Sequence, residues 1–193
     1  MNEVMSGEAA LARMRASMGP LHDRIETAVN LMTPELNADR YQRFLERSFG
    51  FIAACERRFD VRAAPPALHL EARMKTALLA NDLAHFGHTP ATLEQLEAPA
   101  QLPPVGSWPA ALGYFYVIEG STLGGQIIAR HVRATIGMEA ATSFLSDGRA
   151  DVGTRWKQML AVLTGAMSDE RAEAEITAAA AQTFEILHRW HAA

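Results

Sequence analysis

Residues 113–128 read GYFYVIEGSTLGGQII, and this stretch decides the fold. Apolar side chains dominate it, which favours one long helix from about residue 110 to residue 137. Gly120, Gly124 and Gly125 lie inside this helical pattern, although each glycine costs about 1 kcal/mol relative to alanine in a helix interior. Because Gly120 and Gly124 share one helix face, either a close helix contact or a flat ligand on that face would explain them.

Two other interpretations of this stretch are less consistent with its residues. A phosphate-binding loop is disfavoured, because the lysine of a P-loop is missing and the glycines follow a helical segment instead of a strand. Residues 110–129 approach the length of a membrane span, but Glu119, Ser121, Thr122 and Gln126 lie within them. Polar residues at these positions favour a buried helix, so we expect no membrane insertion.

The composition predicts a single all-α domain, a multi-helical bundle over residues 1–193. Alanine is abundant, β-branched residues are sparse and aromatic residues make up 7% of the chain. This balance favours helices, and the length suffices for one core. Disorder is an option for about the first ten residues. Besides the central helix and a short segment up to residue 145, helices are expected over residues 7–32 with an interruption near Gly19-Pro20, 39–59, 68–86, 89–96, 151–167 and 168–191.

The charge and cysteine content exclude several classes of protein. The formal net charge is −4 and no run of lysine or arginine occurs, so nucleic-acid binding is not expected. Cys55 is the single cysteine, which excludes an internal disulfide framework and a thiolate metal cluster. The N-terminal residues lack the sustained apolar core of a signal peptide. These features predict a protein of the reducing cytoplasm.

His22 and Glu26 are four residues apart and therefore lie on one face of the first helix. A neutral histidine can bind a metal through one ring nitrogen while a carboxylate accepts the proton of the other nitrogen and orients the ring. On an exposed helix, however, such a pair is usually only solvated. The motif therefore needs independent support before it can be interpreted as a ligand site.

A di-iron carboxylate site is the alternative metal centre. Glu185 and His188 have the required Glu-x-x-His form, but Asp82 and His85 match a second copy only approximately, and two further glutamates would be needed. The remaining histidines have no comparably specific surroundings: these are His69, His88, His131 and His191. The incomplete ligand set disfavours this alternative.

Two motifs together resemble the haem oxygenase family. They are Leu-His-x-x-x-Glu at residues 21–26 and Glu-Gly-Ser-Thr-Leu-Gly-Gly-Gln at residues 119–126, of which the second is the more specific. The chain is most similar to the bacterial branch associated with bacteriophytochromes, over nearly its whole length. The resemblance implies that haem b lies between a proximal helix, in which Glu26 orients the iron ligand His22, and a kinked distal helix. Its Gly120, Gly124 and Gly125 would face the haem.

The same resemblance implies an activity. Haem would be both cofactor and substrate, and O2 with electrons from a reductase or ferredoxin would convert it to biliverdin, carbon monoxide and ferrous iron. Biliverdin could then pass to a bacteriophytochrome. Gly120, Ser121 and Gly124 would form the catalytic distal surface, and Ser121 stands where many family members carry an aspartate that organises water.

The family also places basic residues at the haem propionates. Arg15 and Lys157 match those places, with Arg155 and Arg130 as weaker candidates, and Phe184 would form a wall of the pocket. Two other functions remain open: a haem carrier or sensor with the same pocket and no turnover, and a haem-free helical bundle that binds other proteins.

Overall fold

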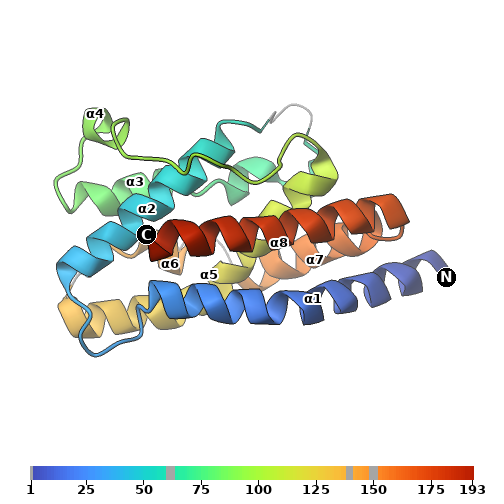
Figure 1. Cartoon of the computed structure of the whole chain (residues 1–193), viewed down its shortest axis with the longest axis horizontal. Helices are drawn as coiled ribbons and strands as arrows, with labels where there is room; N and C mark the ends of the chain where they lie inside the picture. The colour runs from blue at the N-terminus through green and yellow to red at the C-terminus, as the bar shows by residue number, and fades with distance from the viewer. Residues whose placement is uncertain (1, 60–63, 138–140, 148–151) are drawn as a thin grey trace.

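The structure, a computed structural model, describes residues 2–59, 64–137, 141–147 and 152–193 (Figure 1). These residues form helices and no strand, so the expected all-α class is confirmed. The long helices are α1 (Asn2–Val29), α2 (Ala38–Glu56), α5 (Trp108–Ile136), α7 (Val152–Ala166) and α8 (Glu170–Ala192). The short ones are α3 (Thr76–Ala84), α4 (Pro90–Leu93), α6 (Ser143–Ser146) and the 3-10 turns η2 (Pro66–Leu68) and η3 (Leu70–Arg73).

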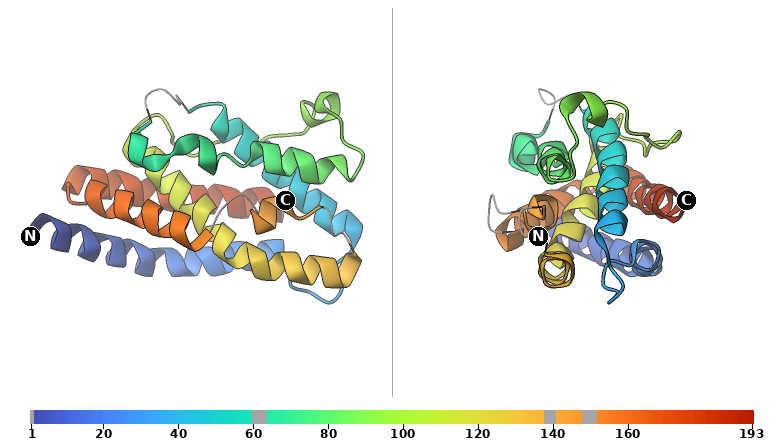
Figure 2. Two further views of the ribbon diagram at one scale, coloured as in Figure 1. Left: turned by 180° about the vertical axis from the view of Figure 1, so that it is seen from behind. Right: turned by 90° about the vertical axis from the view of Figure 1, so that its left-hand side faces the viewer.

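Helix α5 crosses the middle of the bundle and contacts α6, α7 and α8 (Figures 1 and 2). The hydroxyl of Ser107 caps its first turn by accepting from the amide of Ala110 at 3.2 Å. Gly137 ends it in a left-handed conformation with a φ of 69°, which glycine adopts without strain. The first half of α5 is almost entirely buried, which confirms the long buried helix expected from the sequence.

Helix α5 bends near its middle, between the yellow-green first half and the gold second half (Figure 2). Two hydroxyl groups there bond to one backbone carbonyl. Ser121 Oγ donates to the Ile118 carbonyl at 2.8 Å, and Thr122 Oγ1 donates to the same oxygen at 3.3 Å. Such bonds compete with the helical ladder, and together with glycine they are a common cause of helix bending.

Helix α1 lies against α7 and α8 through buried residues that include Met14 and Met18. The predicted interruption near Gly19-Pro20 is wrong, since the helix continues through Pro20. Gly19 and Pro20 are both exposed, so the proline ring and the lost backbone bond lie on the solvent side while packing on either side holds the helix. Helix α1 also includes residues near the N-terminus for which disorder was an option.

Two local predictions differ from the structure. The helix expected over residues 68–86 is divided, because His69 adopts a left-handed backbone with a φ of 47° and α3 begins only at Thr76. The break lets Arg73 and Lys75 turn inward to buried carboxylates. The last helix, expected from residue 168, begins at Glu170, because Asp169 Oδ1 caps it by accepting from the amide of Ala172 at 2.8 Å.

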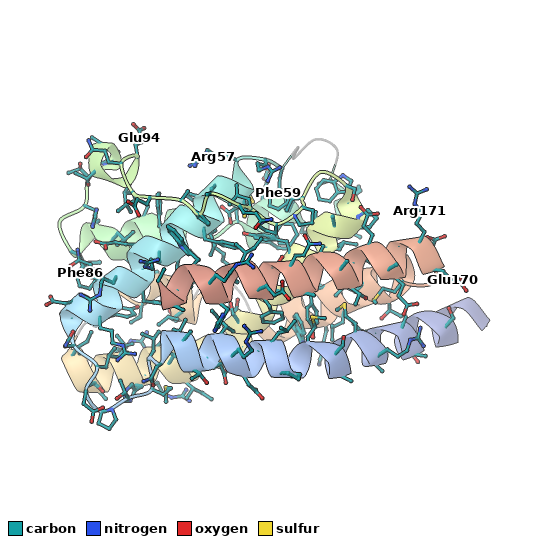
Figure 3. All side chains as sticks on the ribbon, in the orientation of Figure 1. Arg57, Phe59, Phe86, Glu94, Glu170 and Arg171 are labelled. Carbon is teal, nitrogen blue, oxygen red and sulfur yellow. The ribbon has the colours of Figure 1, made fainter. Side chains whose placement is uncertain are left out.

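Side chains fill the interior between the helices (Figure 3). At the start of α5, the ring of Phe59 lies 4.9 Å from that of Phe115, centroid to centroid. Within the described ranges, no helix combines the length and the apolar character needed to cross a membrane.

The end of α8 is fixed on α2. Trp190 Nε1 donates to the carbonyl of Arg47 at 2.8 Å, and the Arg47 guanidinium lies over the Trp190 ring, 4.9 Å from its centroid. The ring of His191 lies 5.6 Å from that of Phe44, centroid to centroid. Burial lowers the pKa of His191 to about 4, and the positive charge of Arg47 acts in the same direction.

The low pKa of His191 predicts how stability depends on pH. In the unfolded chain this histidine titrates near its usual value of about 6.5, so the unfolded state binds the proton more readily. The stability from neutral His191 is therefore complete above that value and is lost as the pH falls towards 4. We expect the free energy of unfolding, measured with urea, to fall between pH 7 and pH 4.5, and His191→Phe to flatten this dependence.

The matched control is His69→Asn, which replaces an exposed histidine at a left-handed position that asparagine tolerates. It should keep the pH dependence of the unmodified chain. An equal slope in His191→Phe and the unmodified chain would contradict the prediction.

Candidate functional site

One face of α5 carries Gly113, Gly120, Gly124 and His131, whose spacings place them in line along the helix. Both ends of this face are covered by other elements. A Cβ atom on Gly113 would lie 2.4 Å from the carbonyl oxygen of Ile176, so α8 approaches α5 closely there. At the other end, His131 Nε2 lies 3.0 Å from the carbonyl oxygen of Thr33, which follows α1.

The middle of the same face is open. No atom of another described element comes within 4 Å of the Cβ position of Gly124, and at Gly120 the indole of Trp156 lies 3.6 Å away. Leu123 and Ile127 flank the glycines with exposures of 43% and 54%. We call Gly120, Leu123, Gly124 and Ile127 the α5 stripe. An exposed apolar surface on a long, otherwise largely buried helix is typical of a binding site for an apolar partner.

His22 lies on α1, which runs side by side with the second half of α5 (Figures 1 and 2). Its side chain is 49% exposed, and one ring nitrogen lies 3.7 Å from Glu26 Oε1, beyond hydrogen-bond length. The Phe184 ring of α8 meets the imidazole edge-on at a centroid distance of 6.2 Å. The imidazole is therefore accessible to a ligand, and a carboxylate lies near enough to orient it.

The structure brings the predicted His22, Glu26 and Phe184 together and does not gather the di-iron ligands. Among the described residues, His22, Asp23 and Glu26 can direct one ligand atom each to a common point. No comparable group joins the histidines and acids of α3 and α8 in those residues. Asp82 instead caps α6, accepting from the amides of Ser143 and Phe144, both at 2.8 Å.

The predicted basic residues differ in their surroundings. Arg15 and Lys157 are exposed, as is Arg130. Burial raises the pKa of Tyr116, and the charge of Arg15 partly offsets that effect. The Tyr116 ring lies 5.7 Å from that of Trp156, so Arg15 belongs to the edge of the α5 stripe near Gly120. Arg155, a weaker candidate, is buried and paired with carboxylates.

Gly125 lies on a different face of α5 from the stripe. A Cβ atom there would lie 2.3 Å from the carbonyl oxygen of Leu145, so the glycine allows α6 to pack directly on the α5 backbone. Gln126 Nε2 strengthens this contact by donating to the carbonyl of Ser146 at 2.9 Å. Helix packing thus accounts for Gly125, and its contact with haem stays a prediction.

A buried cluster of charges lies behind the stripe and was missed by the sequence analysis. We call it the charge cluster; its members are Arg73, Lys75, Glu119, Asp147 and Arg155. Glu119 accepts from Arg73 Nη1 at 2.9 Å and from Arg155 Nη2 at 2.7 Å, while Asp147 pairs with Lys75 and Arg155. The signal was Glu119 itself, an acid inside the apolar run of α5, which had to find buried cations.

Within the charge cluster, the electrostatics favour the ionised form of Asp147. Burial on its own would raise the pKa of Asp147, but hydrogen bonds and charges from Lys75 and Arg155 lower it to about 2. The cluster joins η3, the start of α3, the middle of α5, the end of α6 and α7. It therefore fixes five elements around the point where α5 bends.

Comparison with known proteins now identifies the family. The sequence model of the Heme oxygenase family matches residues 8–193. The chain belongs to the haem oxygenase family. It is also 30% identical over 155 residues to a protein named heme oxygenase from Xanthomonas campestris pv. campestris (strain 8004), covering 79% of this chain and 89% of that protein. The resemblance found in the two sequence motifs is thereby confirmed.

The two neighbouring glycines predict opposite effects on stability. Gly124→Ala adds a methyl group in open space, so the ligand-free protein should gain up to about 1 kcal/mol from helix propensity. Gly125→Ala drives a methyl group against the Leu145 carbonyl, and we expect a loss of about 1 to 3 kcal/mol from overpacking. Urea denaturation of the ligand-free variants measures both. Shifts of the same sign would contradict this assignment of the two faces.

Proposed function

We propose that this chain is a haem-degrading oxygenase that converts haem, O2 and external electrons to biliverdin, carbon monoxide and ferrous iron. The observation that carries the proposal is the open α5 stripe beside the helix that bears His22, in a chain of the haem oxygenase family. The flat, apolar porphyrin matches a surface of glycine and aliphatic side chains. Bound haem supplies the iron at which O2 is activated.

His22 is the proposed iron ligand. A neutral imidazole would bind iron through one ring nitrogen. Glu26 would accept a hydrogen bond from the N–H of the other nitrogen once a small rotation closes the 3.7 Å separation. Phe184, edge-on to the imidazole, limits the rotation of the ring and covers one side of the pocket. These contacts favour one orientation of the ligand before haem arrives.

The distal surface consists of Gly120, Ser121 and Gly124, with Gly125 as a further proposed contact. Glycine brings the α5 backbone close to the substrate and leaves room for a small molecule. Ser121 Oγ donates its proton to the Ile118 carbonyl, so its lone pairs remain to accept from a water. Ser121 would thus order water as an acceptor, with no negative charge of its own.

Cations and partners complete the proposal. Arg15 and Lys157, both exposed, would pair with the two propionates. Electrons would come from a reductase or ferredoxin, and biliverdin would pass to a bacteriophytochrome. The reducing cytoplasm remains the predicted location.

A haem carrier or sensor is the second candidate function. The observation that favours it is Ser121, which replaces the carboxylate that many family members use on the distal side. The same pocket would then bind haem without turnover. The two candidates differ in whether reduced, haem-loaded protein consumes its ligand.

Haem binding through His22 is the first test. His22→Ala should lose the absorption spectrum of histidine-ligated haem and weaken haem affinity by about tenfold or more, and added imidazole should restore the spectrum. His85→Ala, which removes another exposed histidine, is the matched control and should bind as the unmodified chain does. A normal spectrum in His22→Ala would exclude this histidine as the ligand.

Turnover is the second test. Haem-loaded protein, supplied with O2 and a reducing system in the presence of catalase, should lose its Soret band while a biliverdin band grows. Gly124→Ala should slow this reaction, because its methyl group occupies the space proposed for substrate and O2. A stable haem spectrum under sufficient electron supply would reject the oxygenase and favour the carrier or sensor.

A further inference from the structure

Among the contacts between helices α5 and α7 are two pairs of neighbouring residues. Glu119 Oε1 accepts from Arg155 Nη2 at 2.7 Å, and the next residues along each helix, Gly120 and Trp156, form the second contact. The Trp156 indole lies 3.6 Å from the Cβ position of Gly120. The buried Glu119–Arg155 ion pair is therefore adjacent in sequence to Gly120 and Trp156, which lie at the edge of the α5 stripe.

The ion pair is built to fix one relative position of the two helices. Glu119 and Arg155 are both buried, and the Arg155 guanidinium uses one Nη group on Glu119 and the other on Asp147 at the end of α6. Arg73 holds the second oxygen of Glu119 at 2.9 Å. Buried charges joined this way tolerate little sliding, because any shift leaves a charge without its partner.

Trp156 carries the effect of this geometry to the surface. Its indole lies next to Gly120, 3.6 Å from the Cβ position of that glycine, and its ring lies 5.7 Å from that of Tyr116. The charge of Arg15 acts on Tyr116. A shift of α7 along α5 would move the indole over Gly120 or away from it. The width of the open face at Gly120 thus depends on the register of the two helices.

We propose that Glu119 is a positioning residue of the haem pocket: through Arg155 it sets the register of α7 on α5, so that Trp156 closes the pocket edge beside Gly120. Glu119 touches neither substrate nor iron in this role. The inference rests on the proposed function, since it assigns the edge of the same pocket. The inference gives a role to Glu119, which begins the second sequence motif but had no role assigned there.

The test uses Trp156 as its own reporter. The chain has three tryptophans, so a Trp108→Phe/Trp190→Phe background leaves Trp156 as the single emitter. In this background, Glu119→Gln should shift the emission of the ligand-free protein to longer wavelength, since the indole becomes more exposed. Haem titration should show about tenfold weaker binding and an altered Soret band, as expected when a group that orients a ligand site is removed.

A double-mutant cycle separates positioning from general destabilisation. If Glu119 acts through Trp156, the effect of Glu119→Gln on haem affinity should largely vanish in a Trp156→Ala background. Arg155→Lys keeps the buried charge but loses the double contact, and it should reproduce the changes even if Glu119→Gln folds poorly. Leu79→Ala, in the buried part of α3, is the control for lost stability and should leave affinity and Soret band unchanged.

The outcomes distinguish the two proposals. A wild-type chain without saturable haem binding overturns the proposed function and this inference with it. Wild-type chain that binds haem, together with unchanged emission, affinity and Soret band in Glu119→Gln and Arg155→Lys, overturns the inference alone. Additive effects of Glu119→Gln and Trp156→Ala overturn it as well.

Discussion

One face of α5 is covered by other elements at both ends and open in its middle, and the rest of the structure depends on this constraint. At Gly113 the helix backbone packs against α8. At the other end, the His131 side chain contacts the carbonyl of Thr33, in the loop after α1. Between these two contacts, the helix must keep both ends in place and still leave open space at Gly120 and Gly124. The bend near Ser121 and Thr122 reconciles both demands, because it turns α5 without releasing either end.

Elements on the other faces of α5 act as supports for this open region. Helix α6 touches the backbone at Gly125 and is itself capped by Asp82 of α3. The charge cluster holds α5 through Glu119, one residue before the first glycine of the stripe. A buried ion pair is weak evidence for stability, but a network that joins five elements restricts where α5 can lie. The open face can therefore remain free of contacts without becoming mobile.

The sequence predicted the parts of this arrangement that depend on local patterns. The apolar run of α5 and the placement of His22 and Glu26 on one face of α1 both follow from spacing, and the structure has them. The continuous α1 could not be predicted from Pro20, because the burial of Met14 and Met18 in the bundle is a long-range effect that overrides a local signal. Tertiary contacts decide such cases.

The candidate site likewise combines features that follow from local sequence with features that depend on long-range contacts. The motifs located the glycines but could not tell which one packs against another helix. Only the position of Leu145 distinguishes Gly125, which it contacts, from Gly124. The family resemblance made Arg155 a weaker candidate for a haem propionate, but its burial depends on Glu119 and Asp147, which lie 36 and 8 residues away. Partners at such separations are invisible to a local pattern.

The difference between Gly125, which packs against α6, and Gly124, which faces open space, also bears on how this chain has evolved. Gly125 is retained by the fold, but Gly124 is not, since an alanine there would meet no neighbour and would favour the helix. Random substitution should therefore have replaced Gly124 in a lineage that needed only a folded protein, because changes that keep or raise stability pass unopposed. A glycine that the fold does not need leaves open space beside the helix, and the proposed function gives that space a use.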